Sequence, residues 1–360
     1  MEKHYAIFFE FLRFCIGSES EQPSSLKEAD WKALYSIAQK QALMGILFDG
    51  IQRLPSSDMG ISRDLLLQWM AQCQMLEKAN VRLNDAAIQV SEWFRKKGFR
   101  TCILKGQGNA QLYPNGLHRT PGDIDIWVEG GDKRVISFVR SISPHEKACY
   151  HHIEFPSYNG VEVEVHYRPS FLLCFWHNRR LQKYYERVKE KQFSHRVKLG
   201  EQGEVAIPTA EFNLIFQLTH IYAHLMNEGI GLRQLLDYYF VLLHADIKNV
   251  VELQRNLKHI GLWKFAGAVM YVLHEALGLP EEKMIALMDV KRGKLLLEEI
   301  LQGGNFGKYD KRNDFGNSSI GHNLQRLCRD LRLVRFYPAE ALSEPIFRVW
   351  HFFWRLKYRR

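Results

Sequence analysis

The segment RTPGDIDIWVEG, from Arg119 to Gly130, contains two aspartates on either side of one isoleucine. The alternation Asp-Ile-Asp-Ile from Asp123 to Ile126 predicts a β-strand, because successive side chains of a strand point to opposite faces of the sheet. The two carboxylates therefore share one face, where they repel each other. Since Asp is also unfavourable within strands, this arrangement indicates a bound cation that neutralises the pair.

The composition of the chain is that of a globular protein. Of its 360 residues, 46% are hydrophobic and 25% are charged. No run of about 18 apolar residues occurs, so we expect no transmembrane segment. The six cysteines form no C-x-x-C pair, which argues against a zinc knuckle or a disulfide framework and favours a reduced, cytoplasmic setting. The formal net charge of +9 fits either a polyanionic partner or an ordinary basic surface.

Changes in hydrophobic period divide the chain into three parts. Residues 1–97 carry apolar residues at three- and four-residue intervals, which predicts an N-terminal helical region. Residues 98–208 contain short runs of period two and a hairpin-like turn at Gly200–Gly203, which predict a small mixed sheet. The helical period returns in residues 209–360. The expected fold class is therefore α+β, with a sheet domain between N-terminal and C-terminal helical regions.

A second strand, VEVEVHYRP from Val161 to Pro169, supplies a third acidic group. Its alternation places Glu162 and Glu164 on the polar face, and we select Glu164 as a metal ligand, with Glu162 as the alternative. A solvated acidic strand is the simpler interpretation of this segment taken alone. Carboxylates beside substrate phosphates are typical ligands of Mg²⁺. The sequence therefore predicts a Mg²⁺ site at Asp123, Asp125 and Glu164, with two ions when a nucleotide is bound.

A glycine-containing loop precedes the acidic strand. Lys105 and Gly106 directly follow the apolar run FRTCIL. Glycine lets backbone N–H groups approach phosphate oxygens, and lysine supplies a positive charge. Arg119 offers a planar guanidinium group to the same phosphates. Because any strand-to-helix turn can contain glycine, this loop is a candidate phosphate site only in combination with the acidic strands.

These motifs, LKG at 104–106, HRTPGDIDIWV and VEVHYRP, resemble the bacterial "uncharacterised nucleotidyltransferase" family, a branch of the DNA polymerase β-like nucleotidyltransferase superfamily. The resemblance covers residues 98–170 well and the rest of the chain loosely. It implies a nucleotidyltransferase core over residues 98–208. The site residues that it implies are Asp123, Asp125 and Glu164 as catalytic and metal-binding residues, and Lys105, Gly106, Gln107 and Arg119 as nucleotide-binding residues. The family more often has Gly-Ser or Gly-Gly at the loop, and Asp at the third acidic position.

The resemblance also implies a reaction. It is Mg²⁺-dependent transfer of a nucleoside monophosphate, usually AMP from ATP, to an acceptor that is a small molecule, a protein or tRNA. Glu164 would also help to deprotonate the acceptor oxygen. The alternative is a non-catalytic module of the same fold that binds RNA or a partner protein through its basic surface. Three clustered carboxylates favour the enzyme, because a module without catalysis has no use for them.

The histidines near the second acidic strand are less informative. His166 shares the face of Glu164 and would either hydrogen-bond a metal-bound carboxylate or cap the strand. We assign no role to His151 and His152, which precede that strand.

Other features of the C-terminal region have competing interpretations. His220 and His224 lie one helical turn apart, and we favour helix packing over a metal site or a place in an acceptor pocket. Arg233 and Asp237, also one turn apart, most simply form an intrahelical ion pair, with a pair that faces a pocket as the alternative. The aromatic and basic segment FRVWHFFWRLKYRR favours a packed final helix over binding to nucleic acid or an anionic membrane.

Overall fold

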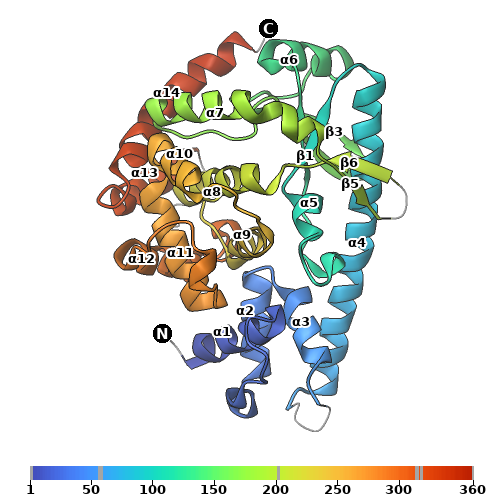
Figure 1. Cartoon of the computed structure of the whole chain (residues 1–360), viewed down its shortest axis with the longest axis vertical. Helices are drawn as coiled ribbons and strands as arrows, with labels where there is room; N and C mark the ends of the chain where they lie inside the picture. Colours follow the sequence, from blue (N-terminus) through green and yellow to red (C-terminus); the bar gives the residue numbers. More distant parts are fainter. Residues whose placement is uncertain (1–2, 56–59, 201–202, 313–315, 317–318, 359–360) are drawn as a thin grey trace.

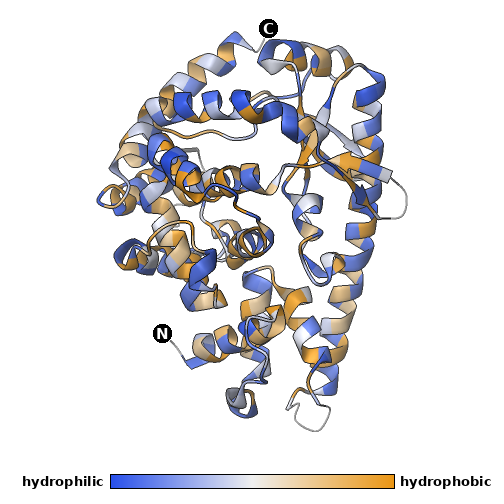
Figure 2. Ribbon diagram, viewed as in Figure 1, coloured by the Kyte–Doolittle hydropathy of each residue, from blue (hydrophilic) through white to orange (hydrophobic). Residues whose placement is uncertain are grey.

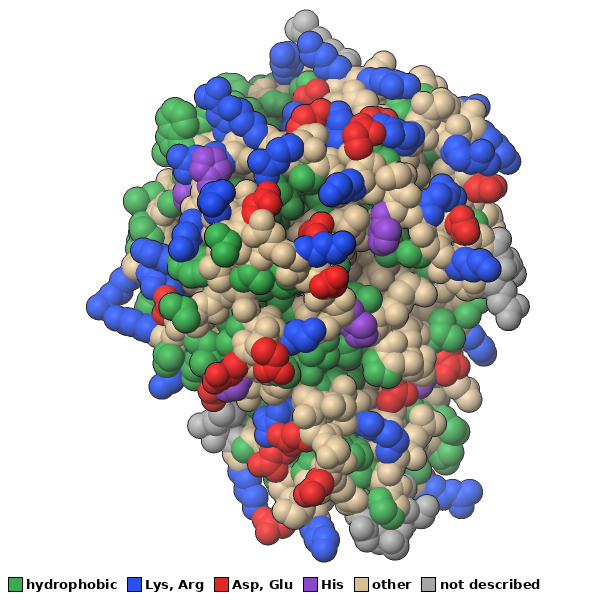
Figure 3. All heavy atoms as spheres, in the orientation of Figure 1, with side chains coloured by type: hydrophobic (Ala, Val, Ile, Leu, Met, Phe, Trp, Pro, Cys, Tyr) green, Lys and Arg blue, Asp and Glu red, His purple; other side chains and the backbone are tan. Residues whose placement is uncertain are grey.

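The structure is a computed structural model that describes residues 3–55, 60–200, 203–312, 316 and 319–358. Helices at both ends of the chain surround a small sheet (Figure 1), which confirms the predicted α+β class. None of the helices in these ranges is long and apolar enough to cross a membrane. On the face shown in Figure 3, Lys and Arg spread over the upper part of the molecule with Asp and Glu between them.

The N-terminal region is helical, as predicted. Its elements are α1 (Lys3–Ile16), η1 (Ser24–Glu28), α2 (Trp31–Lys40), α3 (Met44–Gln52) and α4 (Arg63–Lys96). The hydroxyl group of Ser62 accepts a hydrogen bond from the backbone N–H of Leu65 and so caps the start of α4. This long helix runs along one side of the molecule, from the N-terminal helices to the sheet (Figure 1), and hydrophilic and hydrophobic residues alternate along it (Figure 2).

The central sheet contains β1 (Thr101–Leu104), β2 (Ile124–Val128), β3 (His152–Tyr158) and β4 (Val161–His166) in the order β1-β2-β4-β3. The strands β1 and β2 are antiparallel, β2 and β4 are parallel, and β3 and β4 are antiparallel. The connecting elements are α5 (Gly106–Ala110), η2 (Gly116–His118) and α6 (Gly131–Ile142). The parallel register places Asp125 directly opposite Glu164.

The remaining elements follow the sheet. They are α7 (Phe175–Ser194), β5 (Arg196–Leu199), β6 (Gly203–Ala206), α8 (Ala210–Asn227), α9 (Leu232–His244), α10 (Val250–Ile260), α11 (Trp263–Leu277), η3 (Glu281–Lys283), α12 (Val290–Gly303), η4 (Asn305–Gly307), α13 (Ser319–Leu333) and α14 (Pro338–Lys357). The antiparallel pair β5–β6 confirms the hairpin predicted at Gly200–Gly203.

The two faces of the sheet meet different cores. Ile124 and Ile126 of β2 lie in a core that α4 and α6 complete. The opposite face of β2 carries Asp125 and Trp127, and the Trp127 ring lies 5.8 Å from that of Phe212 on α8. The isoleucines therefore anchor the strand, while the aspartate faces the C-terminal helices.

The larger core joins both ends of the chain. Buried side chains of α1 and α3 belong to the same hydrophobic cluster as those of α8, α9 and α11, and α1 packs directly against α11. The three predicted parts therefore describe the order of elements along the sequence, because the N-terminal and C-terminal helical regions share one hydrophobic core.

Candidate functional site

The site begins where β1 ends. Lys105 leaves the strand with φ of 51° and ψ of −133°, a conformation that glycine adopts more readily. Its Nζ lies 2.8 Å from Oδ2 of Asp125, because the antiparallel register pairs Leu104 with Asp125. Burial opposes the charge of Lys105, but Asp125 and Asp123 outweigh that effect and raise its pKa. The lysine is therefore a fixed cation at the edge of the acidic group.

The three predicted acidic residues converge. Asp123 directly precedes β2, Asp125 lies within it, and Glu164 lies opposite Asp125 on β4. One oxygen of each carboxylate lies within 4.8 Å of the others. The alternative residue, Glu162, is exposed and is not among the residues that line the adjacent cavity. Of the two glutamates, the structure brings Glu164 to the aspartates.

Neighbouring positive charges stabilise the carboxylate of Asp125 more than that of Asp123. Repulsion from Asp125, followed by burial, raises the pKa of Asp123 to about 6. Burial also acts on Asp125, but Lys105 and His166 hold its pKa below the usual range. Asp123 thus ionises at a cost that a cation would remove. Three clustered carboxylate oxygens are a donor set that fits Mg²⁺.

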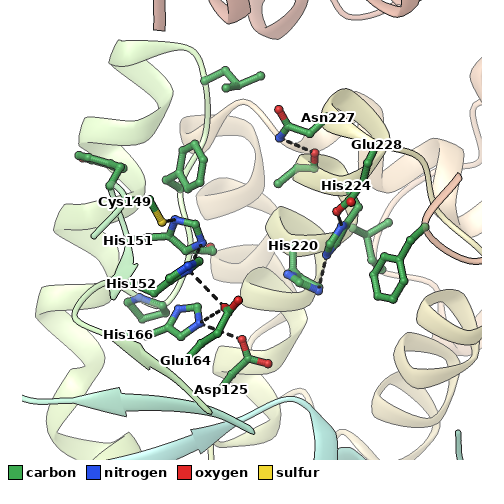
Figure 4. Close-up of a pocket in the computed structure, with 18 of the residues that line it drawn as sticks. Asp125, Cys149, His151, His152, Glu164, His166, His220, His224, Asn227 and Glu228 are labelled. Atoms are coloured by element: carbon green, nitrogen blue, oxygen red, sulfur yellow. Dashed lines mark hydrogen bonds and ion pairs between the residues drawn. The ribbon is translucent and has the colours of Figure 1, made fainter. Parts of the chain in front are cut away.

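His166 and His152 lie beside the acidic residues, and His151 lies next to His152 (Figure 4). Of the three, the sequence predicts only His166 at this place. Nε2 of His166 lies 2.8 Å from Oδ1 of Asp125 and 3.3 Å from Oε2 of Glu164. Although burial opposes the charge, these carboxylates raise the pKa of His166 to about 9. Nδ1 of His152 lies 3.2 Å from Oε2 of Glu164 and 3.1 Å from Nε2 of His151. Burial lowers the pKa of His152 to about 4 and that of His151 well below its usual range, so both are neutral.

The opposite wall of the site comes from α8 (Figure 4). Nδ1 of His224 lies 2.6 Å from Oε1 of Glu228, and Nε2 of His224 lies 2.9 Å from Nε2 of His220. His220 in turn lies 3.4 Å from Nζ of Lys105. Burial, followed by the charge of Lys105, lowers the pKa of His220 well below its usual range. Both histidines line the cavity, which agrees with the alternative of a place in a pocket, although His220 also stacks on Phe216 of the same helix.

Two predictions about arginine require correction. Arg119 lines the cavity, but its Nε and Nη2 donate to the two carboxylate oxygens of Asp237, each at 2.8 Å. Tyr113 donates a third hydrogen bond to Asp237 at 2.7 Å. The predicted intrahelical pair of Arg233 and Asp237 is therefore replaced by a buried pair between distant segments. This arrangement satisfies a carboxylate that burial would otherwise destabilise.

Arg233 is the arginine that faces the cavity with few partners. Its Nη1 donates to the carbonyl oxygen of Thr120 at 3.1 Å, and its guanidinium group lies 5.2 Å from the centre of the Phe306 ring. Nε of Arg233 is buried and has no hydrogen-bond partner among the described residues. Its side chain reaches close to Gly122, beside the acidic strand. The sequence motif did not reveal this residue, because it lies more than 100 positions further along the chain.

The predicted phosphate loop is only partly oriented toward the cavity. Lys105, Gly106 and Asn109 line it, whereas Gln107 does not. The side chain of Gln107 is buried, so any nucleotide contact at this position would come from its backbone. Nε2 of Gln217 donates to Oδ1 of Asn109 at 2.9 Å and holds that amide in the wall.

A cavity of about 1040 Å³ joins these groups. One part of its wall is formed by α13 and α14 and carries Arg326, Arg348 and Arg355. The predicted packing of the final helix is correct for one face, because the ring of Trp350 lies 5.5 Å from that of Tyr150. Other aromatic side chains of α14 are exposed at the rim of the cavity. The volume is at the upper end for small-molecule sites and suits two substrates.

Comparison with known proteins completes the description of the site. A crystal structure of an antigenic nucleotidyltransferase-like protein from Paracoccidioides brasiliensis is similar over 57% of this chain and 94% of that chain, with 13% sequence identity and a TM-score of 0.31. A TM-score of 0.31 is too low to indicate a shared fold. No curated protein matches the chain. A family model described as "Uncharacterised nucleotidyltransferase" matches residues 27–278, which include the acidic residues, the loop and α8. The chain therefore belongs to the uncharacterised nucleotidyltransferase family.

Proposed function

We propose that the protein is a Mg²⁺-dependent nucleotidyltransferase that moves AMP from ATP to an acceptor. The observation that carries this proposal is the convergence of Asp123, Asp125 and Glu164 on the wall of a large cavity. Membership of a nucleotidyltransferase family supports a nucleotide as one substrate.

The acidic residues would hold the metal, and the nearby cations would hold the triphosphate. When bound, Mg²⁺ would neutralise phosphate charge and activate the acceptor oxygen. Lys105 is now paired with Asp125 and would turn toward a phosphate once the carboxylate is neutralised. Glu164, which is less enclosed than Asp125, would accept the proton of the acceptor.

Arg233 is better placed than Arg119 to bind a phosphate. The guanidinium group of Arg119 is occupied on both sides of its fork by Asp237. Among the described residues, Arg233 donates to one backbone carbonyl. Burial, followed by repulsion from Arg119, lowers its pKa. A bound anion would stabilise its charge. We therefore assign the phosphate role predicted for Arg119 to Arg233.

The acceptor is inferred to be anionic. Arg326, Arg348 and Arg355 line the end of the cavity that α13 and α14 form. Glu344 pairs with Arg348 at 3.2 Å, while Arg355 has no carboxylate partner among the described residues. Positive side chains at that end favour a negatively charged acceptor, such as the end of an RNA.

The test is binding of ATP with Mg²⁺ to the full chain by calorimetry, followed by transfer of label from α-³²P ATP to candidate acceptors, RNA included. We expect Asp123→Asn and Glu164→Gln to weaken Mg²⁺-ATP binding by at least about tenfold, or about 1.4 kcal/mol. Arg233→Gln should weaken it by a similar factor.

Glu162→Gln is the matched control, because this exposed glutamate lies on the same strand and is outside the cavity. It should leave ATP binding unchanged. Equal ATP affinity of the wild type, Asp123→Asn and Glu164→Gln would refute the proposal. Loss of binding in Glu162→Gln alone would move the third ligand to that residue.

A further inference from the structure

A second donor set adjoins the proposed magnesium ligands and is rich in imidazole. Nδ1 of His152 and Nε2 of His166 lie 3.2 Å and 3.3 Å from Oε2 of Glu164. Donor atoms of all three residues lie within 4.8 Å of one another. The antiparallel register makes His152 and His166 direct partners on β3 and β4. The set is therefore held by paired strands, which position ligands more closely than loops do.

These separations match those around a small metal ion. A tetrahedral Zn²⁺ ion binds nitrogen and oxygen at about 2.0–2.2 Å, which places neighbouring donor atoms about 3.4 Å apart. The two measured separations from Oε2 of Glu164 are 3.2 Å and 3.3 Å. Two of the three separations are therefore those expected between ligands of one zinc ion, and the third is below 4.8 Å.

The orientation of His166 provides an independent indication of a ligand. Its side chain is 4% exposed, and Nε2 is buried without a well-directed hydrogen bond to any described residue. The nitrogen lies close to Asp125 and Glu164, but it is not aimed at either oxygen. Nδ1 lies 3.3 Å from the carbonyl oxygen of Arg168, the kind of contact that orients metal-binding histidines.

We propose that His152, His166 and Glu164 bind a transition-metal ion of the Zn²⁺ class, without the help of a nucleotide. Imidazole nitrogen suits Zn²⁺, whereas Mg²⁺ prefers oxygen. Zinc binding would displace the proton of His166 to solvent, because a histidine binds a metal only through a deprotonated nitrogen. All three residues line the cavity, so a fourth coordination position is open to a substrate or water, as in catalytic rather than structural zinc sites. The proposal goes beyond the magnesium-dependent reaction and shares with it only Glu164.

Neighbouring candidates fit less well. Cys149 and His151 form a set with His152, but burial raises the pKa of the Cys149 thiol to about 11 and so disfavours the thiolate. In the set of Cys174, His177 and Glu340, one oxygen of Glu340 already accepts two backbone N–H groups.

The experiment uses the full chain after treatment with a chelator, titrated with ZnCl₂ by calorimetry in the absence of nucleotide. We expect one Zn²⁺ per chain, and His152→Ala and His166→Ala should each weaken binding at least tenfold. Co²⁺ in place of Zn²⁺ should give the visible absorption of a tetrahedral site. His145→Ala, at an exposed histidine, and Cys149→Ser are controls that should leave Zn²⁺ affinity within threefold.

Two results would overturn the proposal: no saturable Zn²⁺ binding, or binding that both His152→Ala and His166→Ala leave unchanged. If His166→Ala fails to fold, His152→Ala decides. Asp123→Asn separates this site from the proposed reaction, because it should lose Mg²⁺-ATP binding and keep Zn²⁺ binding. Failure of ATP binding with intact Zn²⁺ binding would contradict only the proposed function.

Discussion

Asp123 and Asp125 are two residues apart, yet their surroundings differ sharply. Asp125 contacts both Lys105 and His166 at 2.8 Å, whereas Asp123 has Asp125 as its strongest electrostatic neighbour. Asp125 therefore stabilises the metal-free protein, whereas the charge of Asp123 destabilises it.

Replacement of each aspartate by asparagine should separate these opposite effects on stability. Asp125→Asn leaves the cations of Lys105 and His166 buried without their anion, and we expect a loss of about 3–5 kcal/mol in the free energy of unfolding. Asp123→Asn removes a repulsion and should cost less than about 1 kcal/mol, or increase stability. Urea unfolding without divalent metal measures both. A larger loss in Asp123→Asn would contradict this interpretation.

Sequence alone predicted the acidic residues but not their partners. The Asp-x-Asp strand and Glu164 follow from period two and from chemistry that is local in sequence. The pair of Arg119 and Asp237 joins positions 118 residues apart, and no local pattern encodes that distance. His152 was missed because no local pattern indicates that β3 lies beside β4.

At the scale of elements, the buried carboxylate of Glu340 on α14 caps the N-terminus of α7. Cys174, the residue before α7, provides no side-chain cap. Oε2 of Glu340 instead accepts hydrogen bonds from the backbone N–H groups of Leu173 and Cys174, at 2.6 Å and 3.0 Å. Its other oxygen lies 3.0 Å from Nδ1 of His177. A negative charge at a helix N-terminus is favourable.

Glu340→Ala should therefore lower the free energy of unfolding by about 2–4 kcal/mol, because it leaves buried N–H groups without partners. Chemical denaturation followed by circular dichroism measures this loss. Ser343→Ala is the control, because the Ser343 hydroxyl donates only to the carbonyl oxygen of Ala339 in the same helix. It should change stability by less than about 0.5 kcal/mol. Equal effects of the two changes would refute the capping role.

A second contact between helices should make stability depend on pH. Asp330 of α13 and Glu344 of α14 are both buried. Burial, followed by the charge of Glu344, raises the pKa of Asp330 to about 7, against the opposing effect of Arg348. The folded state therefore keeps a proton that the unfolded chain releases near pH 4. The contribution of this group to stability falls as pH rises from about 4 to 7 and stays low above that.

Asp330→Asn removes this ionisation. The free energy of unfolding of the variant, relative to wild type, should rise between pH 4.5 and pH 8 by at least about 1 kcal/mol. Urea titrations at several pH values measure the difference, and any constant effect of the amide cancels. A difference that stays flat across this range would contradict the raised pKa.

Elements with a clear hydrophobic period were predictable, and those without it were not. The strands β2 and β4 alternate strictly, and α1 to α4 have regular apolar faces. In contrast, α7 is strongly polar, and only five of its 20 residues are buried. Within the helical period of residues 209–360, residues 281–283 form only a short 3₁₀ turn after Pro280, and the next helix, α12, begins at Val290.

At the scale of the whole molecule, the shared core should make the two ends of the chain unfold together. Phe8 of α1 is fully buried in the cluster that contains α11. Phe8→Ala should lower stability by about 3–5 kcal/mol, and hydrogen exchange should show equal loss of protection in α1 and α11. His4→Ala, at an exposed position of α1, is the control. Loss of protection confined to α1 would show that the N-terminal region unfolds separately.

The backbone conformation of Lys105 should constrain how positions 105 and 125 evolve. Its φ of 51° costs about 1–3 kcal/mol in a residue other than glycine, so the backbone favours glycine while Asp125 favours the lysine. Either Lys105→Gly or Asp125→Asn alone leaves a buried charge unbalanced, whereas the double change removes both charges and relieves the strain. The two positions should therefore be coupled by about 0.5–3 kcal/mol. A lineage that lacked the proposed reaction would be expected to lose both residues, and restoring either one alone would then be selected against.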